Sequence, residues 1–182
     1  MPDVCHRTRG YRAYAVRMTE PRWLNAQEQH SWRSFIDGFR ALVDVLDRQL
    51  QADSKLSHAY YEVLVPLSEE PGRALRMSEL AERARSSRSR LSHAISRLEE
   101  RGWVRRIDCP TDKRGQIAEL TEEGFAVIQA AAPSHVEAVR HYLIDRLSPQ
   151  QLRVLGEIGE IMLSSTAGSD LPARVIEPAR TG

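Results

Sequence analysis

Two short amphipathic helices joined by a tight break constrain the fold of this chain more than any other feature. The first helix is predicted over MSELAERA, and the break falls at Arg85-Ser86. The second helix is predicted over RSRLSHAISRLEER, with Ser87 as its N-cap and Gly102 just past its end. The apolar positions expected to face inward are Met77, Leu80, Ala81, Leu91, Ala94, Ile95 and Leu98. Two helices with about four residues between them match a helix-turn-helix layout.

The segment after these helices has the pattern of a β-hairpin. In WVRRIDCPTDKRGQIAELT, Val104 and Ile107 precede a polar turn rich in Pro, Asp and Gly, and Ile117 and Leu120 follow it. A further helix is expected before the pair, capped by Ser57 and ended by the Glu-Pro-Gly at 70–72. The sequence therefore predicts a mainly α fold with a small β-wing, in which a winged helix-turn-helix lobe covers about residues 56–121.

Long amphipathic helices flank this lobe. One is predicted at about 25–52, starting at an Asn25 cap, and the others fill about 122–164, with a kink at Pro133 and a restart at Ser148-Pro149. They carry more apolar surface than a small wing domain can cover, which predicts a helical dimerisation region in a two-fold homodimer. The folded domain is expected over 23–165, between a disordered leader (1–22) and a disordered tail (166–182).

Composition excludes several classes of protein. The 182 residues have a formal net charge of +1, so global charge attracts neither nucleic acid nor a membrane. The two cysteines, Cys5 and Cys109, form no disulfide framework or metal-ligand set, and no cofactor or metal is predicted. No apolar run approaches the ~18 residues of a spanning helix, so a soluble, cytoplasmic protein without a membrane partner is expected.

The sequence offers no motif that is typical of an enzyme. The sequence contains no Gly-rich phosphate loop, HExxH or nucleophile elbow. Cys5-His6-Arg7 resembles the cysteine motif of DNA alkyltransferases, but Val4 stands where that motif has Pro and the tripeptide lies outside the predicted fold. We therefore expect a protein that is not an enzyme.

Arginines cluster around the second helix of the pair. Residues 83–106 contain eight Arg against two Glu, a local balance of +6. Those on the second helix lie off its apolar stripe, so they face outward, where Arg can form a bidentate fork with guanine edges and Ser and His can bond bases or phosphates. The alternative for any charge run is a solvated face, but the helix-turn-helix spacing and the basic hairpin next door favour a DNA-binding surface. The candidate DNA-binding residues are Ser87, Arg88, Ser89, Arg90, Ser92, His93, Arg97, Lys113 and Arg114.

Taken together, SRSRLSHAISRLEERGWV and the wing pattern Asp-x-Arg-Gly resemble the MarR family of bacterial regulators, over about Trp23 to Leu163. The resemblance implies a triangular homodimer formed by the terminal helices, which binds double-stranded DNA at a pseudo-palindrome. It places the first turns of the second helix in the major groove and Arg114 in the minor groove. The second hypothesis is a protein-interaction module that kept the winged fold without specific DNA binding.

The resemblance also implies repression relieved by a small aromatic or anionic effector. Four side chains are candidates to line such a cleft: Trp32, His58, Tyr61 and His135. The alternative is that these aromatic side chains, at helical spacing, are ordinary core residues. Cys109, beside Pro110, is expected to be an ordinary wing residue, although its oxidation could loosen DNA binding.

Overall fold

The computed structural model describes residues 21–109 and 112–166, and the side chains of 112–114 lie outside that description. The chain divides into two compact units, Met1–Asp37 and Gly38–Gly182. Helix α1 (Ala26–Ser54) begins in the first unit and ends in the second. Its start is a capping box: the Glu28 amide donates to Asn25 Oδ1 (2.9 Å), and the Asn25 amide donates to Glu28 Oε2 (2.8 Å).

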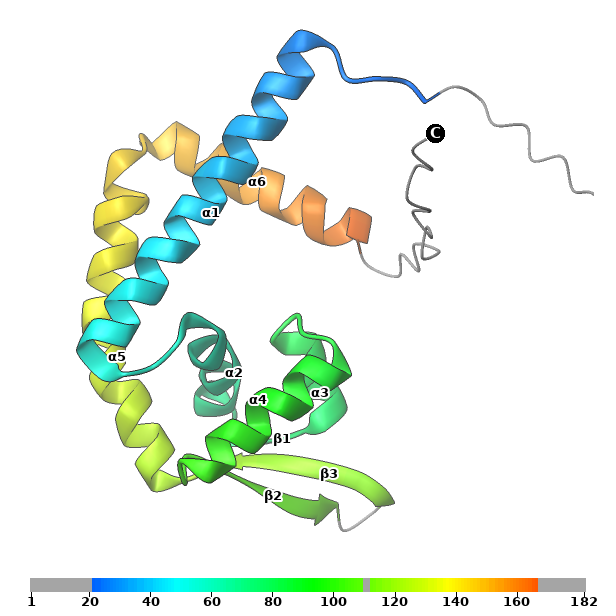
Figure 1. The fold of residues 1–182 in the computed structure, drawn as a ribbon, viewed down its shortest axis with the longest axis vertical. Helices are drawn as coiled ribbons and strands as arrows, with labels where there is room; N and C mark the ends of the chain where they lie inside the picture. The colour runs from blue at the N-terminus through cyan, green and yellow to red at the C-terminus, as the bar shows by residue number, and fades with distance from the viewer. Residues whose placement is uncertain (1–20, 110–111, 167–182) are drawn as a thin grey trace, which may run out of the picture. The chain divides into compact units, whose positions relative to one another are not determined.

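The winged lobe follows in the predicted order. Its elements are α2 (His58–Glu69), β1 (Ala74–Arg76), α3 (Met77–Arg83), α4 (Arg88–Glu100), β2 (Val104–Cys109) and β3 (Asp112–Leu120). In Figure 1, α3 and α4 lie side by side next to the β2–β3 hairpin, and α2 packs against both helices and α5. The helix-turn-helix and the wing are therefore present as the sequence predicts.

The sheet has one strand more than the sequence predicts. Strands β2 and β3 form the expected antiparallel hairpin, with Val104 opposite Leu120 and Ile107 opposite Ile117. The short β1 adds to the other edge of β3, which gives the order β1-β3-β2. Three residues are too few to show the alternation that marks a strand, so the sequence gives no signal for β1.

The core of the lobe lies between α2, α3, α4 and the sheet. Its fully buried side chains come from every helix of the lobe, from the end of α1 and from the loop after α1: Leu50, Leu56, Leu64, Leu67, Leu80, Leu91, Ile95 and Leu98. The apolar stripes predicted for α3 and α4 thus face inward, except that Met77 and Ala94 are only partly buried. Burial of Leu91, Ile95 and Leu98 fixes which side of α4 faces solvent.

After the wing, α5 (Glu122–Tyr142), the 3-10 turn η1 (Ile144–Arg146) and α6 (Pro149–Thr166) complete the fold. Thr121 caps α5, accepting from the Gly124 amide (3.0 Å). Helix α5 runs as one element through Pro133, where the sequence predicts a kink and a resumption. Ser148 and Gln151 exchange the capping-box hydrogen bonds expected at the start of α6, at 2.9 and 3.2 Å.

Helix α6 is largely exposed within the described part of the chain. None of its residues is buried, and its large apolar side chains are exposed by 38% to 66% of their area: Leu152, Val154, Ile158, Ile161, Met162 and Leu163. The predicted excess of apolar surface on the terminal helices is therefore present.

Among the described residues, no helix has the length and hydrophobicity needed to cross a membrane. Most of the predicted leader and tail (1–20 and 167–182) lies outside the described residues, as does Cys5. Of the remainder, Arg22 forms an ion pair with Glu28 (3.1 Å), and Thr166, where the tail is expected to begin, ends α6.

Candidate nucleic-acid interface

The N-terminal turns of α4 present a row of polar side chains to solvent. Ser87 caps the helix, accepting from the Arg90 amide (3.3 Å), so the turn before α4 is held against its first residues. Every candidate predicted on this helix is exposed: Ser87, Arg88, Ser89, Arg90, Ser92, His93 and Arg97. The structure thus places these candidates together on one side of the lobe.

Most of the clustered arginines are engaged within the protein. Five of the eight make hydrogen bonds to acidic side chains or backbone carbonyls: Arg83, Arg97, Arg101, Arg105 and Arg106. Arg85, Arg88 and Arg90 have no ion pair with any described residue. The charge available to an external polyanion is therefore concentrated where α4 begins, and the count of +6 overstates it.

The pair of Arg105 and Glu119 illustrates this internal neutralisation. Arg105 donates two hydrogen bonds to the Glu119 carboxylate, at 2.6 and 3.0 Å, across neighbouring positions of β2 and β3. These bonds lower the pKa of Glu119 and raise the pKa of Arg105, because each charged form stabilises the other. Arg105 thus ties the two wing strands together.

The wing tip completes the predicted surface only in part. The side chains of Lys113 and Arg114 lie outside the described residues, although both belong to β3. The strand register shifts between Asp108 and Cys109, where Cys109 pairs with Asp112. Cys109 is buried and in no disulfide, which agrees with its interpretation as an ordinary wing residue.

A hollow of about 290 Å³ lies between the start of α4, the start of α3 and β3. Its lining includes Arg88 together with Arg76, Ser78 and Gln116, three polar residues that the sequence analysis does not identify. They come from β1, α3 and β3, which only the folded sheet brings beside α4. Their polarity alone could not have identified them as part of this hollow, because exposed polar residues occur throughout the chain.

Three of the four predicted effector residues meet in one cluster. The ring centroids of Tyr61 and His135 are 4.4 Å apart, and those of His58 and His135 are 5.9 Å apart. His135 Nδ1 lies 3.2 Å from Gln49 Oε1. Burial and the neighbouring His58 lower the pKa of His135, and burial raises the pKa of Tyr61.

Trp32 is the fourth predicted effector residue. It lies in the other compact unit and is 55% exposed. There it lines a hollow with Trp23, Leu24 and Arg33.

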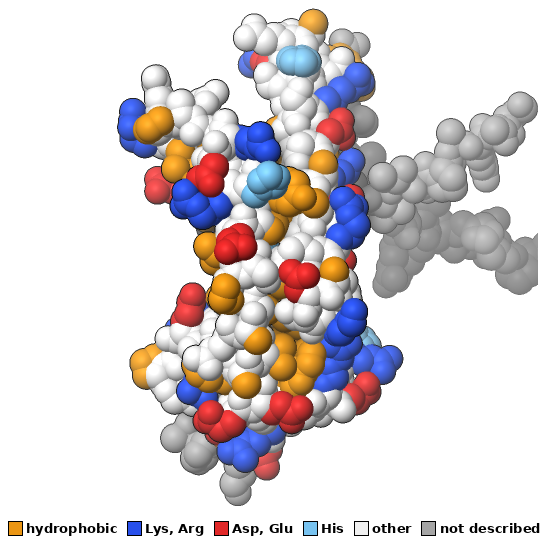
Figure 2. All heavy atoms as spheres, turned by 90° about the vertical axis from the view of Figure 1, so that its left-hand side faces the viewer, with side chains coloured by type: hydrophobic (Ala, Val, Ile, Leu, Met, Phe, Trp, Pro, Cys, Tyr) orange, Lys and Arg blue, Asp and Glu red, His pale blue; other side chains and the backbone are white. Residues whose placement is uncertain are grey.

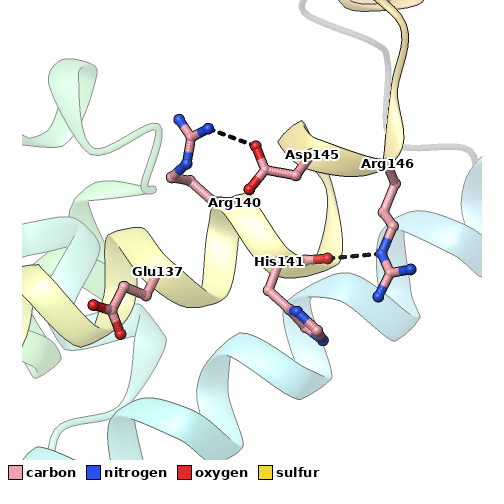
Figure 3. A pocket seen from close by; sticks show the side chains of 5 residues that line it. All are labelled: Glu137, Arg140, His141, Asp145 and Arg146. Carbon is pink, nitrogen blue, oxygen red and sulfur yellow. Dashed lines mark hydrogen bonds and ion pairs between the residues drawn. The ribbon is translucent and has the colours of Figure 1, made fainter.

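Two hollows lie along α5. One of about 660 Å³ is lined by residues of the second half of α1 and of α5, including Gln49, Ser134, His141 and Tyr142. The other, shown in Figure 3, is lined by Glu137, Arg140, His141, Asp145 and Arg146. Its arginines are engaged: Arg140 donates to Asp145 (2.6 Å) and Arg146 to the His141 carbonyl (3.0 Å).

The face that carries α5 differs from the side where α4 begins. Acidic, basic and hydrophobic side chains are intermixed over it (Figure 2). A mixed face of this kind has no preference for a polyanion. A helix-turn-helix whose second helix begins with arginines that have no ion pair among the described residues, next to a hairpin, defines the class: a winged-helix nucleic-acid-binding protein.

Known proteins of the same class resemble this chain closely. A family model described as the MarR family matches residues 54–115. The structure of Sco3205, a MarR family transcriptional regulator from Streptomyces coelicolor in complex with DNA, is similar with a TM-score of 0.78 and 52% identity, covering 89% of this chain and 96% of Sco3205. The transcriptional regulator HosA of Escherichia coli O111:H- is 30% identical over 110 residues, 60% of this chain and 79% of HosA.

The regulator PecS of Dickeya dadantii is 33% identical over 109 residues, 58% of this chain, and the match spans 63% of PecS. The chain belongs to the MarR family of winged helix-turn-helix transcriptional regulators. As a member, it is a DNA-binding regulator, and the family and these relatives are regulators rather than enzymes.

Proposed function

We propose that the protein is a cytoplasmic repressor that binds a pseudo-palindromic operator as a homodimer. The observation that carries this proposal is the start of α4, where Arg88 and Arg90 are exposed without an ion pair among the described residues. Arginines that the protein does not neutralise are available to guanine edges and phosphates. The relative Sco3205 was solved in complex with DNA, which supports DNA binding by this chain.

In this proposal the first turns of α4 enter the major groove. Arg88, Ser89, Arg90, Ser92 and His93 face the base edges there, and Ser87 and Arg97 lie beside them at the backbone. The wing residues Lys113 and Arg114 enter the flanking minor groove, where a narrow A·T-rich groove attracts arginine. The alternative of a protein-interaction module is not favoured, since it gives the unpaired arginines no partner.

The homodimer is supported by the apolar surface of α6. Its apolar side chains occupy more than half of the helix circumference, while Arg153, Glu157 and Glu160 share the remaining side. A second copy of the chain can cover the apolar surface of α6 with its own α6, because a two-fold interface pairs the same surface of both copies. Two recognition helices then lie roughly 10–10.5 bp apart, one helical turn of DNA.

The test is selection of bound sequences from random duplex DNA by the purified chain, with binding to the selected site measured against salt concentration. We expect an enriched palindrome whose half-sites are one helical turn apart, and binding to it that weakens as the salt concentration rises. Absence of enrichment, or enrichment of a single half-site, would contradict the proposal.

A second candidate function is the binding of a small aromatic or anionic effector beside His58, Tyr61 and His135. This cluster is partly exposed, and Gln49, which bonds His135, also lines the hollow of about 660 Å³. Trp32 remains a proposed ligand residue in the other unit. Calorimetry with a set of aromatic carboxylates tests the site. The proposal is supported if a carboxylate binds the chain and releases operator DNA, and if Tyr61→Phe loses this binding. Absence of binding contradicts it.

A further inference from the structure

Arg106 is paired with Ala118 of β3 in the sheet, and its side chain makes hydrogen bonds to three residues of the recognition helix α4. Its Nη1 donates to Glu99 Oε2 at 2.7 Å and its backbone amide donates to Glu99 Oε1 at 3.0 Å. Its Nη2 donates to the Ser92 carbonyl at 3.0 Å and to Ser96 Oγ at 3.1 Å. A residue of the wing strand β2 is thus fixed to two successive turns of α4.

The burial of this network separates it from a surface ion pair. The side chains of Arg106 and Glu99 are 22% and 30% exposed, whereas those of Arg97 and Glu100 on the same helix are 66% and 61% exposed. Hydrogen bonds between charged partners are stronger when water is partly excluded, and breaking one leaves the remaining charge poorly solvated. The Glu99–Arg106 bonds therefore hold a defined geometry.

The neighbouring arginine of β2 points elsewhere. Arg105 bonds Glu119 of β3 and therefore joins the wing strands to each other. Arg106 alone among the described arginines of β2 joins the wing to α4. The Ser92 carbonyl that Arg106 holds belongs to a residue of the proposed DNA-reading surface.

We propose that Arg106 and Glu99 are positioning residues that set the wing relative to the recognition helix, without contacting DNA themselves. This inference rests on the proposed function, because a winged reader binds tightly only when helix and wing meet adjacent grooves at the same time. A wing released from α4 loses its alignment with the minor groove even though every DNA-contacting side chain is still present.

Substitution of Glu99 gives a test whose two outcomes have opposite signs. Glu99→Gln removes a negative charge near a polyanion and frees Arg106, so it tightens DNA binding if Arg106 is a direct contact. If Glu99 and Arg106 position the wing, Glu99→Gln weakens binding to the selected operator by at least about fivefold, the effect of losing one specific contact. The matched control is Glu100→Gln, the same change one residue on, where the pair with Arg97 is exposed.

The control should bind the operator as tightly as the unmodified protein or more tightly. Arg106→Gln should match Glu99→Gln, and the double variant should be no weaker than either single variant, because both remove the same link. The flanking positions of the operator should lose their sequence preference, whereas those read by α4 keep theirs. Glu99→Gln binding as tightly as Glu100→Gln, or additive losses in the double variant, would overturn the inference.

Amide hydrogen exchange of the free protein tests the link without DNA. Exchange in β2 should accelerate in Glu99→Gln and Arg106→Gln and stay unchanged in Glu100→Gln. Equal exchange in all three variants would refute the link even if the chain failed to select any DNA, so failure of the inference and failure of the proposed function are distinguishable. If Glu99→Gln does not fold, Ser96→Ala is the second variant, because it removes only the bond to Arg106 Nη2 from this link. Weaker operator binding and faster amide exchange in β2 are again expected. Unchanged binding and unchanged exchange overturn the inference.

Discussion

Arg90 and Arg97 lie on the same exposed side of α4 but differ in their partners. Arg97 donates to Glu100 at 2.8 Å, and this hydrogen bond raises the pKa of Arg97. Arg90 has no such partner among the described residues. An arginine already bonded to a carboxylate has less to gain from a phosphate or a base, so the two residues should contribute unequally to DNA binding.

Arg90→Ala should therefore cost about 1–3 kcal/mol of operator binding and relax the sequence preference at one position of each half-site. Arg97→Ala is the matched control and should cost less, because it removes a cation that Glu100 already offsets. Competition binding with singly substituted operators measures both. Equal losses at every position for Arg90→Ala would instead identify a phosphate contact, and no loss would remove Arg90 from the interface.

His135 makes the stability of the fold depend on pH. Burial and the nearby His58 lower its pKa below the ordinary value of 6.5, so the folded state favours the neutral ring. The unfolded chain then binds the proton more readily, and stability that is complete above pH 6.5 is lost as the pH falls through the lowered pKa. The groups around the ring are His58, Tyr61 and Gln49, with Glu62 beside His58 and Asp53 bonded to Gln49.

Thermal unfolding from about pH 7.5 to about pH 5.5 should show this loss. His135→Asn keeps a side-chain donor near Gln49 but does not titrate, so its melting temperature should fall less over the same range. His141→Asn, on the same helix, is the control and should behave as the unmodified protein. A pH dependence that is identical in His135→Asn and the unmodified protein would assign the effect to other groups.

Which residues of α4 face outward could be predicted from the sequence, because the stripe of Leu91, Ile95 and Leu98 fixes the helix register. Which arginines are neutralised could not be predicted from the sequence alone. Arg83 bonds Glu70, 13 residues away, in addition to Glu79 on its own helix, and Arg105 bonds Glu119, 14 residues away. Only the folded lobe brings Glu70 and Glu119 to these arginines. The local balance of +6 counted along the sequence therefore does not show which arginines are paired with carboxylates in the fold.

At the scale of elements, Thr121 joins the wing to α5. Its hydroxyl accepts from the Gly124 amide and lies 2.7 Å from the Gly102 carbonyl and 3.1 Å from the Trp103 carbonyl. The same junction requires Gly124, since a Cβ there would overlap the Trp103 carbonyl oxygen. Helix cap and close backbone approach together fix where α5 leaves the sheet.

Thr121→Ala should lower the free energy of unfolding by about 1 kcal/mol, the usual cost of losing an N-cap. Chemical denaturation measures this change. Thr121→Ser is the control and should retain most of the stability, because it keeps the hydroxyl. A loss as large in Thr121→Ser as in Thr121→Ala would attribute the effect to the methyl group rather than to the cap.

The starts and ends of the helices were predicted well, and the short strand β1 was not. The caps at Asn25, Ser57, Ser87, Thr121 and Ser148 are local signals, each formed by residues within one turn. Strand β1 exists because β3 offers it a partner edge more than 40 residues away in sequence, from Ala74 to Glu119. Such a pairing leaves no mark in three residues.

At the scale of the whole molecule, the exposed apolar side chains of α6 form an arc around the helix that is the interface of the proposed homodimer. Ile158→Lys places a charge in this arc and should shift the chain from dimer to monomer and abolish binding to the full palindrome. Glu160→Lys, on the polar side of the same helix, introduces a larger change in charge and should leave the dimer intact. Sedimentation equilibrium measures the mass of each variant. A dimeric Ile158→Lys would exclude α6 from the interface.

Four of the eight clustered arginines are paired with carboxylates of the protein, and we expect this pairing to influence how the regulator finds its site. Attraction to arbitrary DNA depends on how many unneutralised cations a protein presents, and here the net charge is only +1. The chain should then dwell only briefly on the many unrelated sequences of a chromosome, which leaves a larger share of its copies in free diffusion. We therefore expect occupancy of the operator to depend on base recognition more than on non-specific binding to DNA. A modest number of molecules should then suffice to keep one promoter occupied.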